Sequence, residues 1–338
     1  MVTPLVVVIV FMIVFTVIGN TTICYIIYRV RRLHCPSCLF LVNLAINDIL
    51  VAVFLLPFTV ASSFHNSHAV VGKIGCEIIG FFQHATSTVS VLTLLSVSMD
   101  RYLAILMPLK YKGWVTRNKT VLCILGIWLY ALLSACFPLL GWSRYHYIPG
   151  LWLCESDYHV SVSFTYFKLT TMYFLPLVSI IFIYISILRV ALRHSRQIAR
   201  EVKALRQREL TAVLEPELGG QVSAAVISGQ YCMRKPHSAL RADIKTALTL
   251  ASIVGVLFIT WTPYTVVNLW SFHTGQHAPE LLQSIVSGLY YATGVINPYL
   301  YGYLNRVIKR EFKTMWASTR TFCTWIRANK IRPATETT

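Results

Sequence analysis

Long apolar stretches without a charged residue alternate with short charged segments along the whole chain. The charge-free runs are residues 1–28, 49–72, 78–99, 120–143, 169–188, 246–279 and 281–305. A helix needs roughly 20 apolar residues to cross the hydrocarbon core of a membrane, and each run reaches this length once the second is extended back through Asp48 to about Cys38. Because the runs do not alternate as membrane strands do, the pattern predicts seven membrane-spanning helices.

Composition agrees with a membrane protein. Of the 338 residues, 56% are hydrophobic and only 13% are charged, whereas an ordinary soluble domain is about a quarter charged. The net charge of +17 would suggest nucleic-acid binding in a soluble protein. Here nearly every Lys and Arg falls around 29–37, 103–119 and 189–245 or in the tail from Arg306.

Basic residues are retained on the cytoplasmic side of a membrane, so the charges report topology and no nucleic acid is needed to explain them. We expect the N-terminus outside, the C-terminus in the cytoplasm, and a basic inner face that suits anionic membrane lipid and acidic partners. The basic, helix-forming sequence from Arg189 to Leu210 predicts that the fifth span continues into the cytoplasm.

The nine cysteines are too few and too scattered for a disulfide scaffold. Cys76 and Cys154 are both expected outside, in an oxidising compartment where a bridge can persist. Cys35 and Cys38 form a C-x-x-C on the cytoplasmic side with no second pair nearby, which disfavours zinc and redox roles. An enzyme is not expected, because no nucleophile with a base and no metal cluster falls at one depth.

Eight short motifs follow one another along the seven runs. They are Gly19-Asn20, Asn43-Leu44-Ala45-x-x-Asp48, Cys76, Asp100-Arg101-Tyr102, Trp128, Pro176 with Tyr184, Trp261-x-Pro263, and Asn297-Pro298-x-x-Tyr301. In this order they resemble the rhodopsin-like (class A) G-protein-coupled receptors over almost the whole chain. The resemblance implies an all-α membrane protein, a seven-transmembrane helix bundle over 1–305 with a third cytoplasmic loop at about 193–238. A short amphipathic cytoplasmic helix and a tail follow at 306–338.

The same resemblance implies a function. The chain would be a receptor of the plasma membrane that transmits an extracellular small-molecule signal, or constitutive activity, to heterotrimeric G proteins, with arrestin as a further partner. The alternative is a seven-helix transporter or channel without G-protein coupling, which the lack of an internal repeat weakens. The tail carries Cys323, a candidate palmitoylation site.

Polar residues fall at mid-membrane depth in several spans. Asp48 lies near the middle of an apolar run, where an ionised carboxylate is costly unless it is paired, hydrated or bound to a cation. The resemblance implies an allosteric sodium site at Asp48, Ser90 and Asn297, with no other metal or cofactor. The alternative is a hydrogen-bonded cluster that binds no ion.

An activation switch is implied at the cytoplasmic end of the third span. There Arg101 would pair with Asp100 and Asp243 in the resting state and move toward a G protein in the active state. For Asp243 the alternative is a solvated acid in a basic loop. Further implied members of the switch are Tyr102, Tyr184, Trp261, Pro263, Asn297, Pro298 and Tyr301, and the prolines bend their helices.

A ligand pocket is expected at the outer half of the bundle. Residues at i, i+4 and i+7 share a helix face, which places Gln83, Ser87 and Ser90 toward the interior. The candidate ligand-binding residues are Gln83, His84, Ser87, Lys168, Trp261, Asn268 and Tyr291. Lys168 either faces the cavity, pairing with an anionic ligand, Glu155 or Asp157, or snorkels to the interface.

Three positions narrow the class of ligand by comparison with the family. Gln83 stands where amine receptors carry an aspartate, which disfavours a simple biogenic amine. Tyr291 stands where opsins carry the retinal-binding lysine, so a photoreceptor is not expected. The stretch from Asp100 to Trp142 and Asn268 resemble adenosine receptors and related orphan receptors, but Glu155-Ser156-Asp157 and Tyr290-Tyr291 depart from that pattern. We expect an orphan-like relative whose ligand is unknown.

Overall fold

A computed structural model describes residues 2–64, 68–148, 152–214, 251, 254–256, 258–276, 278–304 and 307–314. The spanning helices are α1 (Val2–Arg29), α2 (Pro36–Leu50), α4 (His68–Leu106), α6 (Arg117–Cys136), α7 (Val162–Leu169), α8 (Leu175–Leu214), the helical residues 258–274, and α10 (Glu280–Leu304). A π-helical turn, η2 (Val51–Leu55), joins α2 to α3 (Leu56–Phe64), and a second π-helical turn, η3 (Thr170–Phe174), joins α7 to α8. Shorter helices are η1 (Arg31–Leu33), α5 (Pro108–Trp114) and residues 307–314.

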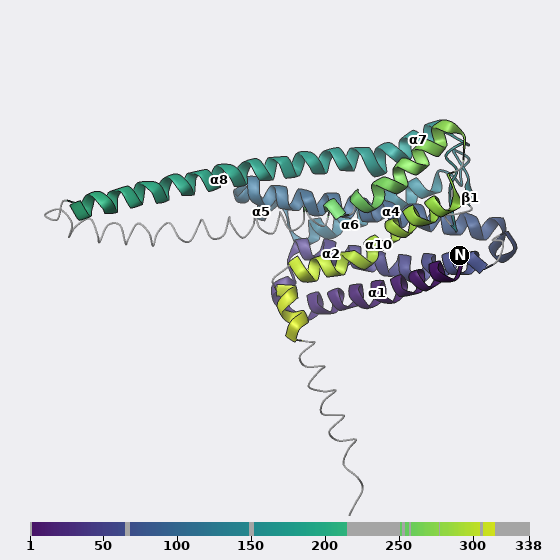
Figure 1. Cartoon of the computed structure of the whole chain (residues 1–338), viewed down its shortest axis with the longest axis horizontal. Helices are drawn as coiled ribbons and strands as arrows, with labels where there is room; N and C mark the ends of the chain where they lie inside the picture. The colour runs from purple at the N-terminus through teal and green to yellow at the C-terminus, as the bar shows by residue number, and fades with distance from the viewer. Residues whose placement is uncertain are drawn as a thin grey trace, which may run out of the picture.

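Within the described residues, five continuous helical stretches are long and apolar enough to cross a membrane. They are Val6–Arg29, Pro36–Ser62, Gly72–Leu106, Arg117–Cys136 and Val162–Gln207. The second includes α2, η2 and most of α3, and the fifth includes α7, η3 and most of α8. With residues 258–274 and α10 they form the bundle in Figure 1. Large apolar side chains face outward from it, such as Phe11, Val178 and Phe182, which suits a lipid environment.

Local sequence signals explain where several helices begin. Pro36 occupies the first turn of α2, where its missing N–H has no helical partner to lose. Thr116 caps α6 by accepting a hydrogen bond of 3.4 Å from the backbone N–H of Lys119. Gly72 adopts φ +62° within α4, a backbone conformation that favours glycine, so the regular third span starts after it.

The loop before α7 folds back over one end of the bundle. Strands β1 (Tyr145–Ile148) and β2 (Leu153–Ser156) pair antiparallel, with Tyr147 opposite Cys154. Cys154 is bonded to Cys76 at the start of the third span, with a Cα–Cα distance of 5.3 Å, which confirms the predicted disulfide. A Cβ at Gly80 would overlap the Tyr145 ring, so this glycine lets the hairpin lie against α4.

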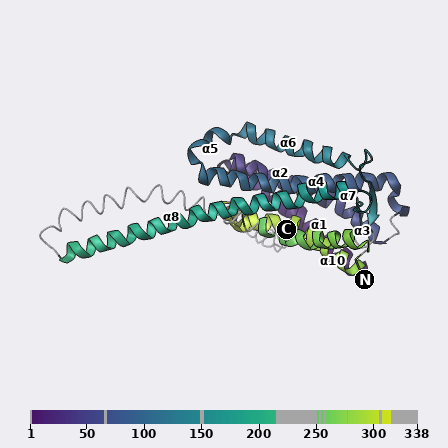
Figure 2. The ribbon, with the colours of Figure 1, turned by 90° about the horizontal axis from the view of Figure 1, so that it is seen from above.

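At the opposite end α8 extends far beyond the other helices, as Figures 1 and 2 show. The extension includes the basic residues from Arg189 onward, and α8 remains helical to Leu214. The first part of the segment 193–238 is therefore helical, as its helix-forming sequence predicts. The core between α1, α2, α4 and α10 contains the fully buried side chains of Ile23, Leu44 and Leu94.

Candidate functional site

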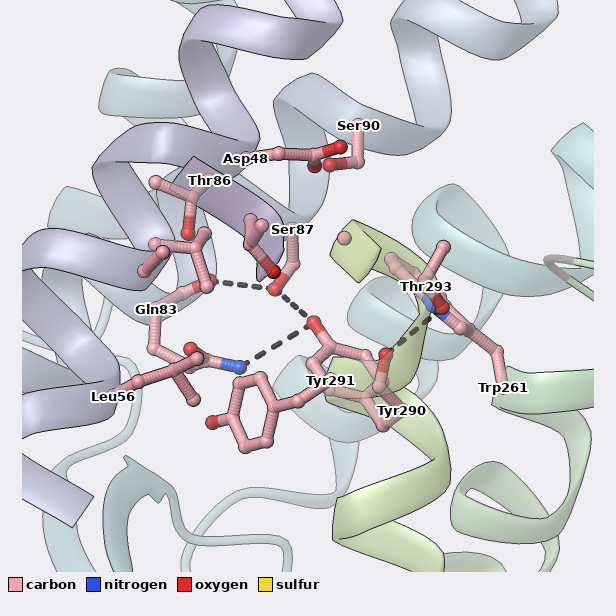
Figure 3. Close-up of a pocket in the computed structure, with 14 residues that line it drawn as sticks. Asp48, Leu56, Gln83, Thr86, Ser87, Ser90, Trp261, Tyr290, Tyr291 and Thr293 are labelled. Atoms are coloured by element: carbon pink, nitrogen blue, oxygen red, sulfur yellow. Dashed lines mark hydrogen bonds between the residues drawn. The ribbon is translucent and has the colours of Figure 1, made fainter. Parts of the chain in front are cut away.

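A buried polar cluster lies halfway along the bundle. The Asn297 amide donates a hydrogen bond of 3.0 Å from Nδ2 to Oδ2 of Asp48, and Asp48 is only 6% exposed. Asn47 donates from Nδ2 to the Ser90 hydroxyl at 2.8 Å and to the backbone carbonyl of Thr86 at 3.1 Å. In Figure 3 the Asp48 carboxylate and the Ser90 hydroxyl face each other. The structure thus brings together the three residues predicted for the sodium site.

Asn47 had not been selected from the sequence. It occupies one of the unspecified positions of the Asn43-Leu44-Ala45-x-x-Asp48 motif, so the motif carries no signal for it. The sequence does carry a weaker signal. Asn47 is an amide next to Asp48 within an apolar span, where a polar side chain needs hydrogen-bond partners.

A first cavity of about 40 Å³ opens between Asp48 and the outer half of the bundle. It is lined by Thr16, Asp48, Val51, Ala52, Leu56, Gln83, Thr86, Ser87, Ser90, Trp261, Tyr290, Tyr291, Thr293 and Gly294. Figure 3 shows the Tyr290 hydroxyl reaching Ser87 and Gln83. It shares a hydrogen bond of 2.5 Å with the Ser87 hydroxyl and accepts one of 3.3 Å from the Gln83 amide nitrogen.

Tyr290 connects this cavity to Trp261. Their ring centroids are 4.7 Å apart, so the two rings pack directly against each other. The predicted site residue was its neighbour Tyr291, which is also buried and lines the same cavity. Both tyrosines therefore belong to the site, on different sides of one turn of α10.

A second cavity of about 50 Å³ lies nearer the hairpin end of the bundle. It is lined by Gln83, His84, Ser87, Glu155, Tyr158, Lys168, Leu169, Met172, Tyr173, Trp261, Tyr264, Thr265 and Tyr290. Six of the predicted ligand-binding residues thus line one or both cavities, and these are Gln83, His84, Ser87, Lys168, Trp261 and Tyr291. Asn268 is buried but lines neither of these two cavities.

Lys168 faces the second cavity and does not snorkel to the interface. Its Nζ donates hydrogen bonds of 2.5 Å to Oε1 of Glu155, 2.8 Å to the Ser156 hydroxyl and 3.3 Å to the Tyr158 hydroxyl. The Tyr264 hydroxyl donates to the other carboxylate oxygen of Glu155. Of the two acids considered for Lys168 from the sequence, Glu155 is therefore the partner.

Asp157 is buried and instead pairs with the exposed Arg144, whose Nη2 lies 3.3 Å from Oδ2 of Asp157. Partial burial alone would raise the pKa of this carboxyl, but the backbone N–H of His159 and the side chains of His146 and Arg144 outweigh it. The pKa of Asp157 is therefore lowered from its ordinary value.

Several buried polar atoms of the site have no hydrogen-bond partner within the described residues. They are both ring nitrogens of His84, Oε1 of Gln83, Nε1 of Trp261 and Nδ2 of Asn268. Buried polar atoms normally have a protein or water partner. The first three residues line the second cavity, so this cavity offers unpaired donors and acceptors to a bound molecule or to water.

Arg101 lies in α4, the helix that also carries Gln83 and Ser87 of the cavities, but at its other end. It forms an ion pair with Asp100, in which Nε donates to Oδ2 at 2.9 Å. Ser37, at the start of α2, donates to Oδ2 of Asp100 at 2.6 Å and accepts from Arg101 Nη2 at 2.5 Å. The Tyr111 hydroxyl donates to Oδ1 of Asp100 at 2.9 Å. Sequence reasoning does not single out Ser37 or Tyr111 for the switch, because no local pattern connects either residue with Asp100 or Arg101.

The other predicted switch residues have different outcomes. Tyr184 shares a hydrogen bond of 3.4 Å with Ser98. Tyr102 and Tyr184 both pack against the buried cluster of Ile105, Ile183 and Ile187. Trp261 and Pro263 lie in the helix 258–274, and Asn297 and Pro298 lie in α10. Asp243, Cys323 and the side chain of Tyr301 lie outside the described residues, so the Asp243 clamp stays a prediction.

Comparison with known proteins agrees with this arrangement. The family model described as 7 transmembrane receptor (rhodopsin family) matches residues 19–301. G-protein coupled receptor 161 of Danio rerio is 29% identical over 308 residues, which cover 88% of this chain and 56% of the relative. Melanopsin of Mus musculus is 29% identical over 289 residues, which cover 84% of this chain and 50% of the relative. The chain therefore spans about half the length of the curated relatives that it matches.

A solved structure shows the same fold. The crystal structure of squid rhodopsin has a TM-score of 0.75 with this chain at 22% sequence identity, covering 95% of this chain and 86% of that one. The predicted seven-helix membrane fold is confirmed. The finer resemblance to adenosine receptors stays a prediction.

Proposed function

The chain belongs to the rhodopsin family of seven-transmembrane receptors, and from this premise we propose that it passes a signal from its outer cavities to heterotrimeric G proteins. This is a family of receptors and not of enzymes, and it does not favour the transporter alternative. One observation carries the proposal. A single helix, α4, holds Gln83 and Ser87 at the cavities and Arg101 at its other end, where Asp100 and Ser37 retain the guanidinium.

The proposed mechanism is a shift between two arrangements of the bundle. Trp261 lines both cavities and packs on Tyr290, which is hydrogen-bonded to α4 through Ser87. A ligand that moves Trp261 changes these contacts between α10, α4 and the helix 258–274. The ligand shifts the equilibrium only by its difference in affinity for the two arrangements. The active arrangement releases Arg101 from Asp100 toward a G protein.

The proposed topology places the hairpin and the N-terminus outside and α8's extension in the cytoplasm of a plasma-membrane receptor. The Cys76–Cys154 bond supports this orientation, because disulfides persist in oxidising compartments. The basic extension of α8 supports contact with G protein, arrestin and anionic lipid headgroups.

The proposed ligand is a small molecule that is neither a simple amine nor retinal. The two cavities share Gln83, Ser87, Trp261 and Tyr290, so a ligand here would meet polar and aromatic side chains together. Gln83 supplies no negative charge for an ammonium group, and the phenol of Tyr291 has no amine with which to form a Schiff base. Because Asn268 lines neither cavity, its position does not support an adenine-binding role.

We also propose that Asp48, Ser90 and Asn297 hold an allosteric sodium ion. The carboxylate and the nearby hydroxyl and amide oxygens are ligands of the kind that a hard cation takes, and a buried carboxylate gains stability from a cation. Basal nucleotide exchange should fall when sodium replaces potassium at constant ionic strength, and Asp48→Asn should abolish this difference. Sodium sensitivity retained in the Asp48→Asn variant would contradict the assignment.

The experiment that tests the receptor function is G-protein nucleotide exchange in membranes that contain the receptor, without ligand and with a metabolite library. Arg101→Gln should abolish exchange at unchanged surface expression. Arg29→Gln, which removes an exposed arginine at the end of α1, is the matched control and should retain exchange. Solute uptake that persists in the Arg101 variant, with no G protein ever responding, would refute the receptor function.

A further inference from the structure

Two cysteines meet at the turn that leads into α2. Cys35 is the N-cap residue of this helix, with an extended backbone (φ −84°, ψ 155°), and Pro36 follows it in the first turn. The backbone N–H of Cys38 donates a hydrogen bond of 3.0 Å to the Cys35 carbonyl. Cys35 is exposed and Cys38 is buried. One thiol is therefore accessible from solution, and the second lies one helical turn behind it.

The surroundings of Cys35 favour its thiolate form. The Cys38 thiol interacts with it as a hydrogen-bond donor and lowers the pKa of Cys35 most. Burial opposes this effect, but the backbone N–H of Cys38 and the charge of Arg101 add to it, and the pKa falls to about 6. The positive end of the helix dipole acts in the same direction. A thiolate is the reactive form of cysteine toward oxidants.

The residue between the two cysteines belongs to the Arg101 network. Ser37 accepts a hydrogen bond from Arg101 and donates one to Asp100. A bond between Cys35 and Cys38 would therefore restrain the backbone that holds the Ser37 hydroxyl at Arg101 and Asp100. Spacing alone did not favour a redox role for this pair. The fold adds an accessible thiolate, a thiol beside it and a contact with the switch arginine.

We propose that Cys35 and Cys38 form a reversible disulfide on reaction with a hydroperoxide, and that this bond restrains Ser37 against Arg101. In the first step the Cys35 thiolate attacks a peroxide oxygen, an S–O bond forms, the O–O bond breaks, and the leaving hydroxide or alkoxide takes up a proton. In the second step the Cys38 sulfur attacks the Cys35 sulfur, the S–S bond forms, the S–O bond breaks, and the sulfenic hydroxyl leaves with the thiol proton as water. The two thiols lose two electrons, and the peroxide gains them.

The bond should lower receptor activity. In the proposed active arrangement Arg101 leaves Asp100 and Ser37. A disulfide that restrains the turn keeps Ser37 in place, so this release becomes less favourable. Intracellular thiols reduce such bonds, so that cytoplasmic disulfides are transient and sensory. The effect on signalling rests on the proposed G-protein function, whereas formation of the bond does not.

The test uses the full chain in membranes, treated with hydrogen peroxide and then with N-ethylmaleimide before proteolysis. Mass spectrometry should find the peptide with Cys35 and Cys38 lighter by two hydrogens and unlabelled. A sample without peroxide, in which the exposed Cys35 should carry the label, serves as the control. Basal nucleotide exchange should fall by about five-fold, a typical allosteric coupling, and recover with a thiol concentration that leaves Cys76–Cys154 intact.

Cys35→Ser should prevent both the bond and the fall in exchange, and because Cys35 is exposed this variant should fold. A peptide that keeps both thiols after peroxide overturns the proposal, and so does a bond that forms without any change in exchange. An equal fall in exchange in Cys35→Ser overturns it as well. If even the reduced wild type catalyses no exchange, the G-protein function fails instead, and the mass of the peptide alone decides whether the disulfide forms.

Discussion

Replacing Lys168 with methionine tests whether its ion pair with Glu155 is a buried structural contact. The two side chains are only 11% and 8% exposed. The substitution removes the ion pair and the hydrogen bonds to Ser156 and Tyr158, and it leaves the carboxylate of Glu155 buried without a cation. Removing one partner of a buried pair costs about 3–5 kcal/mol.

The ion pair between Arg144 and Asp157 in the same loop provides a control of different exposure. Arg144 is 68% exposed, and Asp157, although only 9% exposed, keeps its hydrogen bond from the backbone N–H of His159 when Arg144 is removed. The loss should therefore be close to that of an exposed pair, roughly 0–1 kcal/mol. Arg144→Met should therefore change stability little. Native tryptophan fluorescence during heating of the purified receptor, in one detergent, measures both variants against wild type.

The double variant Lys168→Met/Glu155→Gln separates loss of attraction from the cost of an unpaired charge. Because the glutamine carries no charge, the double variant should recover more than half of the stability lost in Lys168→Met. Equal melting temperatures for Lys168→Met and Arg144→Met would refute the inference that burial makes the loss of Lys168 from its pair with Glu155 more costly than the loss of Arg144. A double variant that is less stable than Lys168→Met would refute the role of the unpaired carboxylate.

Three further predictions concern single contacts. Gly19→Ala should destabilise the bundle by about 1–3 kcal/mol, because the alanine Cβ would lie 2.7 Å from Cγ of Pro298. The measurement is the melting temperature, and an unchanged value would contradict this packing. Trp128→Phe should cost about 1–3 kcal/mol by the same assay, because Nε1 donates at 2.9 Å to the buried Asn43; an unchanged melting temperature would contradict this contact. The lowered pKa of Asp157 contributes stability that is present above its unfolded pKa and is lost as the pH falls through its folded pKa. Stability below about pH 4 should therefore depend less on pH in Asp157→Asn, and an identical pH profile would contradict the linkage.

The switch illustrates where prediction from the sequence stopped. Arg101 and Asp100 are neighbours in a recognisable motif, so their pairing was predicted. Ser37 lies 63 positions from Asp100, and no local pattern connects them, because the contact depends on how the start of α2 packs beside α4. The same holds for Tyr290, which meets Gln83 across 207 positions.

The sequence by itself determined the seven spans, their expected orientation, the family and the candidate disulfide. These properties depend on the length of apolar runs, the placement of charges and short motifs, all of which can be read along one dimension. The tertiary structure decided that Lys168 pairs with Glu155, that Asn47 binds Ser90, and that the two cysteines lie beside Arg101. Such choices depend on the distances between helices, because a buried charge or amide bonds to whichever partner the packing brings within reach.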